Sequence, residues 1–294
     1  DAFYKATADG SIAAGKPVVA TAEGKVKTIS ETDISQAAGT PVAIENSFNL
    51  NFGVAYDSVN QKVVVAYRDL GNSSYGTAAV GTVDPSDNSI SFGTPVVFDS
   101  GGTIFQIGAS YDTNAGKIVV VYRDFGNSSY GTAIVGTVSG TSISFGTATV
   151  YNSATSEQNH VAYDSTAQKH VIVYQDGTNL NAIVGTVSGT SISFGTEATV
   201  SANADYGVPD VVYDSGNDKS VVFYGDNGDS QKGKAKVGTV SGTSISFGTA
   251  AEFEGGTTLR ISAAYDSSAG KVVVAYKDSG DSDKGKAAVG TVSG

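Results

Sequence analysis

The sequence has no cysteine, no methionine, no tryptophan and only two histidines, His160 and His170. Without cysteine there is neither a disulfide framework nor a thiolate metal site, and two histidines leave little for a zinc centre. The start of the chain lacks the basic residues and the apolar core of a signal peptide. The missing initiator methionine fits removal of an N-terminal piece and equally fits a sequence read from a mature particle.

Long apolar runs and clustered basic residues are also missing. No run approaches the roughly 18 apolar residues that a membrane helix requires, so we expect no membrane insertion. The chain carries 29 acidic and 18 basic residues and a formal net charge of −11. Binding to a phosphate backbone depends on clustered lysine and arginine, so nucleic acid is not expected as a partner. The hydrophobic content of 40% is enough for a sizeable core in 294 residues.

A repeat runs through most of the sequence. A hydrophobic stretch ends in Tyr-Asp, with a lysine five residues after the aspartate, and the tyrosines recur every 50 to 55 residues, at Tyr56, Tyr111, Tyr163, Tyr213 and Tyr265. This period is close to that of β-propeller blades and longer than most leucine-rich or ankyrin periods.

One repeat is predicted to form a four-stranded antiparallel meander. In the second repeat the expected strands cover residues 104–111, 117–124, 131–138 and 142–145. Valine, isoleucine and tyrosine favour pleated strands, and Asp, Asn and Gly between these runs favour turns. No segment of the chain has the pattern of a helix.

The ends of the repeat region predict a closed ring. A single sheet of this size cannot bury both of its faces, so the repeats must stack, either around an axis or in a line. The last repeat stops at residue 294, before its fourth strand, and residues 39–45 match residues 93–99, which follow the fourth strand of the first repeat. We therefore predict an all-β fold in which residues 39–294 form a five-bladed β-propeller of four-stranded antiparallel blades. Pairing of the N- and C-terminal strands in one blade would close it and remove two exposed edges.

Residues 1–38 do not share the repeat. Two short strands are expected, within residues 9–20 and 23–29, and Lys5, Lys16, Lys25 and Lys27 lie close together in the sequence. We interpret this region as a small β attachment segment. The alternative is an outer strand pair of the ring.

The aspartates of the repeated Tyr-Asp motif are candidate ligand sites. Each is followed five residues later by a lysine, which gives the pairs Asp57 and Lys62, Asp112 and Lys117, Asp164 and Lys169, Asp214 and Lys219, and Asp266 and Lys271. An aspartate that opens a turn accepts hydrogen bonds from nearby backbone N–H groups, and a lysine after the turn can form a weak surface pair with it. The motif therefore predicts a turn rather than five binding sites.

The loops after the second strand are the candidate binding region. Polar side chains beside an aromatic ring are what sugar binding uses. The predicted ligand-binding residues are Arg68, Asn72, Tyr75, Arg123, Asn127 and Tyr130. The alternative is a solvated hairpin in which Tyr75 and Tyr130 pack on the neighbouring blade.

The sequence patterns for a cofactor or for catalysis are weaker than the pattern for sugar binding. Asp278, Asp281 and Asp283 place three carboxylates within six residues and suggest calcium, although their spacing differs from that of an EF-hand loop. No other cofactor is expected. The repeats are near copies, so no unique acid–base pair stands out, and the sequence predicts that the protein is not an enzyme.

Residues 122–147, from Tyr122-Arg123-Asp124 to Ser144-Phe145-Gly146-Thr147, resemble repeats in virion structural proteins of tailed phages that infect aquatic bacteria. The leader at residues 9–18 is more distantly similar to strand pairs of phage fibre and head-decoration proteins. The resemblance implies a tail fibre or capsid decoration protein on the virion surface. It would contact other virion proteins through residues 1–38 and present its propeller for adhesion to host-surface glycans. A soluble carbohydrate-binding lectin, like the tachylectin-type lectins in architecture, and a purely structural filament or decoration subunit are the alternatives.

Overall fold

The computed structural model describes residues 18–20, 26–28, 38–45, 49–204 and 207–293. The chain divides into two compact units, residues 1–40 and residues 41–294. In the first unit, β1 (Val18–Ala20) and β2 (Val26–Thr28) pair in antiparallel fashion, with Val19 opposite Lys27. Most of the predicted attachment segment, including Lys5, Lys16 and Lys25, lies outside the described residues, and its role stays a prediction.

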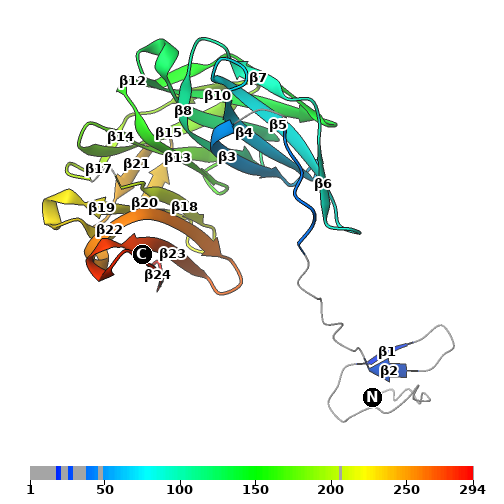
Figure 1. Cartoon of the computed structure of the whole chain (residues 1–294). Helices are drawn as coiled ribbons and strands as arrows, with labels where there is room; N and C mark the ends of the chain where they lie inside the picture. Colours follow the sequence, from blue (N-terminus) through cyan, green and yellow to red (C-terminus); the bar gives the residue numbers. More distant parts are fainter. Residues whose placement is uncertain (1–17, 21–25, 29–37, 46–48, 205–206, 294) are drawn as a thin grey trace. The chain divides into compact units, whose positions relative to one another are not determined.

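Residues 41–294 form antiparallel sheets, and each sequence repeat contributes the same order of strands (Figure 1). The all-β prediction is confirmed. The first strands are β3 (Asn49–Asp57), β8 (Ile104–Asp112), β13 (Glu157–Asp164), β18 (Asp210–Asp214) and the second half of β22 (Ala251–Asp266). The second strands are β4 (Lys62–Asp69), β9 (Lys117–Asp124), β14 (Lys169–Asp176), β19 (Lys219–Asp226) and β23 (Lys271–Asp278). The third strands are β5 (Tyr75–Asp84), β10 (Tyr130–Ser139), β15 (Asn179–Ser188), β20 (Lys232–Ser241) and β24 (Lys284–Gly290).

The fourth strand of a repeat is made in two pieces that pair with the same third strand. In repeat 1, β6 (Ser89–Phe92) pairs with the end of β5, and β7 (Val96–Asp99) pairs with its beginning. The corresponding pieces are β11 (Ser142–Phe145) and β12 (Thr149–Thr155), β16 (Ser191–Phe194) and β17 (Ala198–Ser201), and β21 (Ser244–Phe247) and the first half of β22. Because β22 runs on into the first strand of repeat 5, repeats 4 and 5 belong to one seven-stranded sheet.

Helical turns are short. Among the described residues, three 3-10 turns follow second strands: η1 (Phe125–Asn127), η2 (Asn227–Asp229) and η3 (Ser279–Asp281). None of the described residues forms a helix long and apolar enough to cross a membrane.

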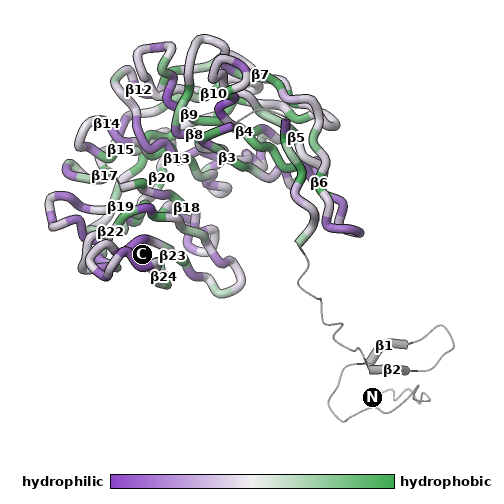
Figure 2. The backbone as a smooth tube through the Cα atoms, in the orientation of Figure 1, coloured by the Kyte–Doolittle hydropathy of each residue, from purple (hydrophilic) through white to green (hydrophobic). Residues whose placement is uncertain are grey.

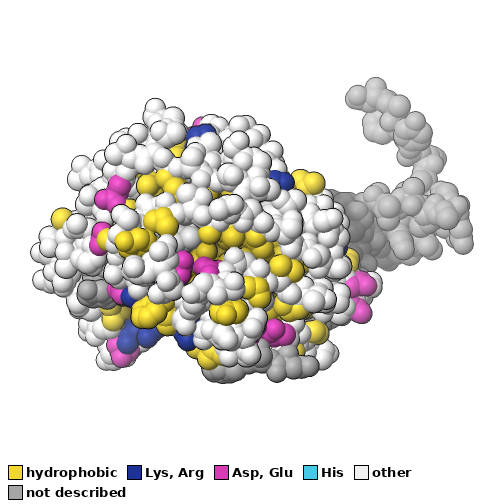
Figure 3. Space-filling model, turned by 90° about the horizontal axis from the view of Figure 1, so that it is seen from above, with side chains coloured by type: hydrophobic (Ala, Val, Ile, Leu, Met, Phe, Trp, Pro, Cys, Tyr) yellow, Lys and Arg dark blue, Asp and Glu magenta, His cyan; other side chains and the backbone are white. Residues whose placement is uncertain are grey.

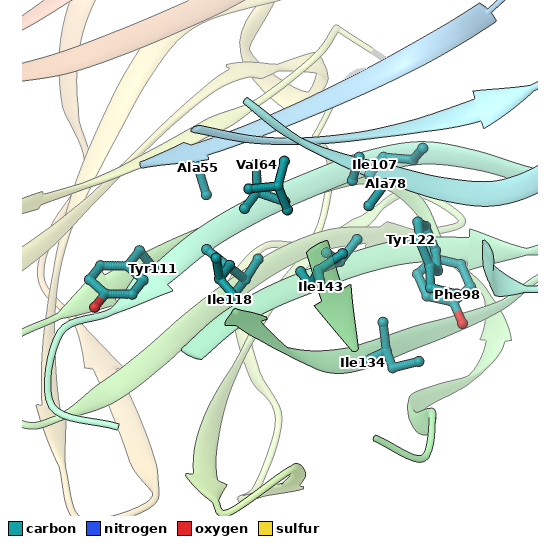
Figure 4. Packing of buried hydrophobic residues seen from close by; sticks show 14 of the residues in the cluster. Ala55, Val64, Ala78, Phe98, Ile107, Tyr111, Ile118, Tyr122, Ile134 and Ile143 are labelled. Atoms are coloured by element: carbon teal, nitrogen blue, oxygen red, sulfur yellow. The ribbon is translucent and has the colours of Figure 1, made fainter. Parts of the chain in front are cut away.

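The core lies between consecutive repeats. Figure 2 shows hydrophobic residues along the strands and hydrophilic residues in the turns that join them. The cluster between repeats 1 and 2 contains Val64, Ala78, Ile107, Ile118 and Ile143, and all five side chains are buried (Figure 4). Repeats 2, 3 and 4 therefore each bury two faces against their neighbours, because a lone sheet of this size leaves an apolar face in water.

First strands of consecutive repeats lie side by side, from β3 through β8, β13 and β18 to β22. Residues that take the same position in these strands consequently come together on the inner side of residues 41–294. The third and fourth strands lie outside them (Figure 1).

The predicted closing strand is not paired in the structure. Residues 41–45 form no strand, and Ile44 packs against Val65, Tyr67 and Ala79 of repeat 1. Among the described strands β24 pairs only with β23. The structure thus shows the repeated antiparallel sheets without the closure of the ring.

Candidate functional site around the inner strands

The Tyr-Asp aspartates cap the turns that join first and second strands, as their sequence context predicts. Asp112 Oδ1 accepts hydrogen bonds from the backbone N–H groups of Asn114, at 3.0 Å, and Ala115, at 2.8 Å. The other four aspartates make the same contacts. In this part of the chain no ion pair links any of them to the lysine five residues later. The weak surface pairs expected there are absent from the described residues, and the contacts that these aspartates make are those of turn caps.

The tyrosine of the motif has a second role, which the sequence did not predict. Its hydroxyl reaches back to the turn of the preceding repeat. Tyr213 donates to Thr166 Oγ1 at 2.8 Å, and Tyr265 accepts a hydrogen bond from the Gly216 N–H at 3.1 Å. Tyr111 faces Asp57, and burial together with this carboxylate raises the pKa of Tyr111 to about 12. The Tyr-Asp motif therefore joins consecutive repeats.

Two of the predicted binding residues position the inner strand of the following repeat. The Arg68 guanidinium lies over the Phe105 ring, 4.4 Å from its centroid. Arg123 Nη1 lies 2.9 Å from Glu157 Oε1. Each arginine also donates to a serine of its own loop, Ser74 or Ser129. Both side chains are thus engaged within the protein.

The other four predicted residues are divided between the turn and its exit strand. The backbone N–H groups of Asn72 and Asn127 donate to Asp69 and Asp124, each at 3.0 Å, while the two asparagine side chains are exposed. Tyr75 and Tyr130 begin the third strands and are half-buried. The structure does not bring the six residues into one site, because they lie in two loops of different repeats.

The three predicted calcium ligands are each paired with lysine. Lys286 Nζ lies 2.5 Å from Asp278 Oδ2, Lys284 Nζ lies 2.9 Å from Asp281 Oδ1, and Lys277 Nζ lies 2.9 Å from Asp283 Oδ1. In the part of the chain that the structure describes, no three potential ligand side chains gather at metal-binding distance. A calcium ion would have to displace these ammonium groups.

A different set of residues comes together on the inner strands. One residue in each of β3, β8, β13 and β22 has a positive φ of 51° or 52° and interrupts the pairing with the second strand as a β-bulge. These residues are Asn51, Gln106, Gln158 and Arg260. Left-handed backbone is unfavourable for residues other than glycine, by roughly 1–2 kcal/mol, and bulges re-aim side chains, often beside functional sites. All four stand five residues before the motif tyrosine, and Val208 occupies this place in repeat 4.

These side chains line two adjoining hollows. A hollow of about 270 Å³ is bordered by residues of four repeats, including Asn51, Gln106, Gln158 and Val208. A second hollow, of about 240 Å³, shares Gln158 and Val208 and is completed by Arg260 and its neighbours. The two hollows together are as large as a pocket for a small ligand. We call them the axial site.

The axial site contains polar atoms without an internal partner. Gln106 Oε1 and Asn159 Nδ2 are buried, and in the described part of the protein neither has a hydrogen-bond partner. A buried polar atom left unpaired costs roughly 1–3 kcal/mol. Gln106 and Asn159 also line the larger hollow, so two amide groups with an unpaired polar atom lie beside it.

One titratable pair adjoins the axial site. His160 lines the larger hollow, and its Nδ1 lies 3.3 Å from Asp210 Oδ1. Asp210 Oδ2 accepts a hydrogen bond from the Ala263 N–H at 2.8 Å, so this aspartate links repeats 3, 4 and 5. A carboxylate that holds an imidazole in place is an arrangement found in general acid–base catalysis.

The second histidine is enclosed and does not reach a hollow. His170 Nδ1 lies 2.9 Å from Ser110 Oγ, and its Nε2 lies 3.4 Å from Asp112 Oδ2. Burial lowers the pKa of His170, although Asp112 opposes this effect. Burial would raise the pKa of Asp112, but hydrogen bonds from His170 and from the Ala115 N–H outweigh it and lower that pKa to about 2. Although serine, histidine and aspartate meet here, all three are buried, and no substrate could reach the serine.

Comparison with known proteins shows the fold. No family model matches the sequence. No curated protein matches it either. Among solved structures, the intramolecular trans-sialidase of Ruminococcus gnavus has a TM-score of 0.57 at 8% identity, over 86% of this chain and 80% of that one. A protein from Lactobacillus plantarum has a TM-score of 0.55 at 12% identity, over 87% of this chain and 69% of that one. NanB sialidase of Streptococcus pneumoniae has a TM-score of 0.54 at 11% identity, and the matched part is 81% of this chain and 40% of NanB.

These neighbours contradict the prediction of a non-enzymatic virion surface protein. Sialidases and trans-sialidases share this arrangement of sheets, so the fold is one on which glycan-processing enzymes are built. The prediction of no enzyme is corrected for the same reason. That prediction assumed that near-identical repeats offer only equivalent positions. The axial site departs from this, since its bulged residues differ between repeats and the pair of His160 and Asp210 occurs once.

The residues of the axial site carried a signal that sequence reasoning missed. In the first strands, a polar residue stands five positions before the motif tyrosine in four of the five repeats. This position varies, as Asn, Gln, Gln, Val and Arg, while the residues on either side of it are apolar in repeats 1, 2 and 5. Variation at a fixed place in a repeat could have identified the inner wall. The bulge that turns these side chains inward was not predictable from strand periodicity.

Proposed function

We propose that this chain is a carbohydrate-active β-propeller with five blades that takes a glycan into the axial site. The observation that carries the proposal is the β-bulge at the same place in four inner strands. It turns Asn51, Gln106, Gln158 and Arg260 towards the hollows. Amide and guanidinium groups match the hydroxyl groups of a sugar, and the likeness to sialidases supports this class of ligand.

Arg260 favours a glycan that carries a carboxylate. A guanidinium binds a carboxylate through two parallel hydrogen bonds, and such charge-assisted bonds are stronger than neutral ones. Arg260 is exposed and lines the smaller hollow, so its guanidinium is accessible to a ligand there. Sialylated and uronic acid-containing glycans are therefore the first ligands to test.

His160 and Asp210 are the acid–base pair of the proposed activity. The imidazole lines the hollow in which the sugar would lie, and the carboxylate behind it fixes the ring. In this arrangement the protonated imidazole can donate a proton to the glycosidic oxygen as the bond to the anomeric carbon breaks, and a water molecule then adds to that carbon and returns a proton to the imidazole; Asp210 stabilises the ring while it is charged. Binding and bond cleavage are separate properties of the site, and they are tested separately.

The test uses the whole chain with a glycan array and with an assay for released sugar. We expect binding of acidic glycans, and Arg260→Ala should weaken it by about 10-fold to 100-fold, the range for loss of a hydrogen bond to a charged group. His160→Gln should retain binding and lose sugar release. Thr141→Ala, in an exposed turn between β10 and β11, is the matched surface control. Absence of binding to every glycan would refute the proposal, and binding that Arg260→Ala leaves unchanged would place the ligand elsewhere.

A further inference from the structure

The interface between repeats 2 and 3 is polar at places where the interface between repeats 1 and 2 is apolar. Five buried places of the two interfaces correspond in the sequence repeat. The apolar residues Ala55, Phe98, Ile104, Ile107 and Ile118 are replaced there, in this order, by Ser110, Tyr151, Ser156, Asn159 and His170. None of these side chains is more than 9% exposed. The second interface has therefore gained hydrogen-bonding groups while its side chains stay buried.

These polar side chains join the two repeats through hydrogen bonds. Ser110 Oγ of repeat 2 lies 2.9 Å from His170 Nδ1 of repeat 3. The Tyr151 hydroxyl of repeat 2 donates to Asn159 Oδ1 of repeat 3 at 2.6 Å, and Ser156 Oγ donates to the same oxygen at 2.6 Å. Between repeats 1 and 2 apolar side chains fill the corresponding space (Figure 4). Buried hydrogen bonds of this kind are satisfied only while the two repeats keep their alignment.

The titratable member of this interface is His170, which packs with its neutral imidazole matched on both sides. Its Nε2 lies 3.4 Å from Asp112 Oδ2. An ionised carboxylate only accepts hydrogen bonds, so Nε2 carries the hydrogen of the neutral ring. Nδ1 then accepts a hydrogen bond from the Ser110 hydroxyl.

Asp112 of β8 is the charged group that faces this imidazole. On β13, the Tyr163 ring lies beside it, with ring centroids 5.0 Å apart. Burial, together with the Asp112 carboxylate, raises the pKa of Tyr163 to about 12, so this phenol stays neutral on acidification. On β15, Gly185 stands opposite His170 and carries no titratable side chain. Lys169 precedes the histidine on β14 and takes the opposite face of the sheet.

Protonation of His170 disturbs the contact with repeat 2. A proton on Nδ1 turns this atom from an acceptor into a donor, so the Ser110 hydroxyl has to reverse its hydrogen bond. Burial lowers the pKa of His170, and Asp112 opposes this effect only in part. A base with a lowered pKa stabilises the folded state above its unfolded value, about 6.5, and this contribution is lost as the pH falls towards the folded pKa. Acid therefore favours an open interface in which water reaches the imidazole.

This interface adjoins the axial site. The inner strands β8 and β13 lie side by side. The larger hollow is bordered by Gln106 of β8 and by Gln158 and His160 of β13. A change in the packing of these two strands consequently changes the wall of the hollow.

We propose that the interface between repeats 2 and 3 is an acid-sensitive joint, in which protonation of His170 loosens the contact between β8 and β13. Between repeats 4 and 5 the places of Ser110 and His170 are taken by Val212 and Val272, which pack in one apolar cluster. Acid therefore acts on one interface and leaves this other one closed. The proposal concerns the scaffold, and it is tested without a ligand, so its outcome is separate from that of the glycan proposal.

Hydrogen exchange followed by mass spectrometry tests the joint on the whole chain at pH 7 and pH 5, with labelling times scaled to the intrinsic exchange rate at each pH. Peptides of β8 and β13 report on the joint. Acidic side chains are scattered over the face shown in Figure 3, so their protonation is not confined to one interface. Peptides of β18 and of the second half of β22 therefore serve as the internal control. The matched variant is Ser110→Ala with His170→Ile, which gives the joint the residues that Ala55 and Ile118 already supply between repeats 1 and 2.

Exchange in β8 and β13 of the wild-type protein should be faster at pH 5 than at pH 7 by about 3-fold to 30-fold. The upper limit follows because an imidazole of pKa about 6.5 is protonated about 30 times more often than it is neutral at pH 5. The control peptides and the double variant should show no such change. No acceleration in β8 and β13, an equal acceleration in the control peptides, or an acceleration that persists in the double variant would overturn the proposal.

A second measurement needs no variant of the joint. The chain has only two histidines, so a protein with labelled histidine gives two sets of imidazole NMR signals, and His160→Gln assigns them. The signals of His170 should titrate over the pH range in which exchange in β8 and β13 accelerates. A His170 that stays neutral throughout that range would overturn the proposal.

Discussion

The contact between Tyr111 and Asp57 offers a direct measurement of how strongly consecutive repeats are held together. The Tyr111 hydroxyl faces the Asp57 carboxylate across the interface of repeats 1 and 2. Both side chains are buried, at 9% and 1% exposure. Tyr111→Phe removes the hydroxyl and keeps the ring, so the substitution isolates the polar contact from the packing.

The buried hydroxyl lies beside the carboxylate without the geometry of a full hydrogen bond, so the expected loss of stability lies at the lower end of the range for a hydrogen bond to a charged group, about 1.5–3 kcal/mol. Asp57 keeps the bonds from the Val59 and Asn60 N–H groups and from Asn60 Nδ2, so its carboxylate does not become unpaired. We therefore expect about 1.5 kcal/mol, which for a domain of this size lowers Tm by roughly 3–6 °C.

Urea unfolding followed by circular dichroism measures this difference. Tyr56→Phe is the control, because Tyr56 takes the same place in repeat 1, is 55% exposed, and loses the same hydroxyl in the substitution. A loss below about 0.5 kcal/mol for Tyr111→Phe, or an equal loss in both variants, would refute the reasoning.

The same contact has a pH dependence of defined sign. Burial alone would raise the pKa of Asp57, but hydrogen bonds from Asn60, with further ones from Tyr111 and Val59, lower it. A carboxylate whose folded pKa is lowered stabilises the protein above its unfolded value, about 3.9, and loses this contribution as the pH falls through the folded pKa. The difference between wild type and Tyr111→Phe should therefore be full at neutral pH and shrink below about pH 4.

Three further outcomes are expected. Because burial lowers the pKa of His170, the wild-type protein should lose stability as the pH falls below about 6.5. In His170→Ile, Tm should change less between pH 7 and pH 5 than in wild type, and an equal change in both proteins would contradict this. Gly131→Ala should destabilise by about 1–3 kcal/mol, since its Cβ would lie 2.4 Å from the Tyr151 ring, whereas Gly285→Ala should match it only if the ring closes. Millimolar calcium should leave Tm unchanged because lysines occupy the acidic turn after β23, and a rise of several degrees would restore the calcium prediction.

The order of the strands could be predicted from the sequence because the same sequence pattern recurs in each repeat. The Tyr-Asp motif marks the turn between first and second strands, and the Ser-Ile-Ser-Phe run marks β11, β16 and β21. Local propensity and turn chemistry agree in every repeat, and this agreement makes a pattern predictive. The division of the fourth strand into two pieces, at a Gly-Thr pair, was not foreseen.

The candidate site was not readable in the same way. Loops rich in Asn, Ser and Tyr are the glycan site that the sequence predicts; in the structure the backbone N–H groups of Asn72 and Asn127 donate to aspartates that close the turns, and the two side chains are exposed. The axial site depends on a bulge that reverses the inward and outward alternation at one residue. The alternation of residues along a strand predicts which face of the sheet each side chain lies on. A bulge changes this alternation locally, so the alternation alone does not predict where a bulge lies.

Because of the bulges, the residues that line the axial site are different from the residues that pack the repeats together. Asn51, Gln106, Gln158, Val208 and Arg260 line hollows and belong to none of the core clusters between repeats. A substitution at one of these positions changes the side chains that line the hollows. It does not change the contacts that pack one sheet against the next. Mutation can therefore explore combinations of side chains around one centre while the scaffold stays constant, as the loops of a binding protein do on a fixed framework.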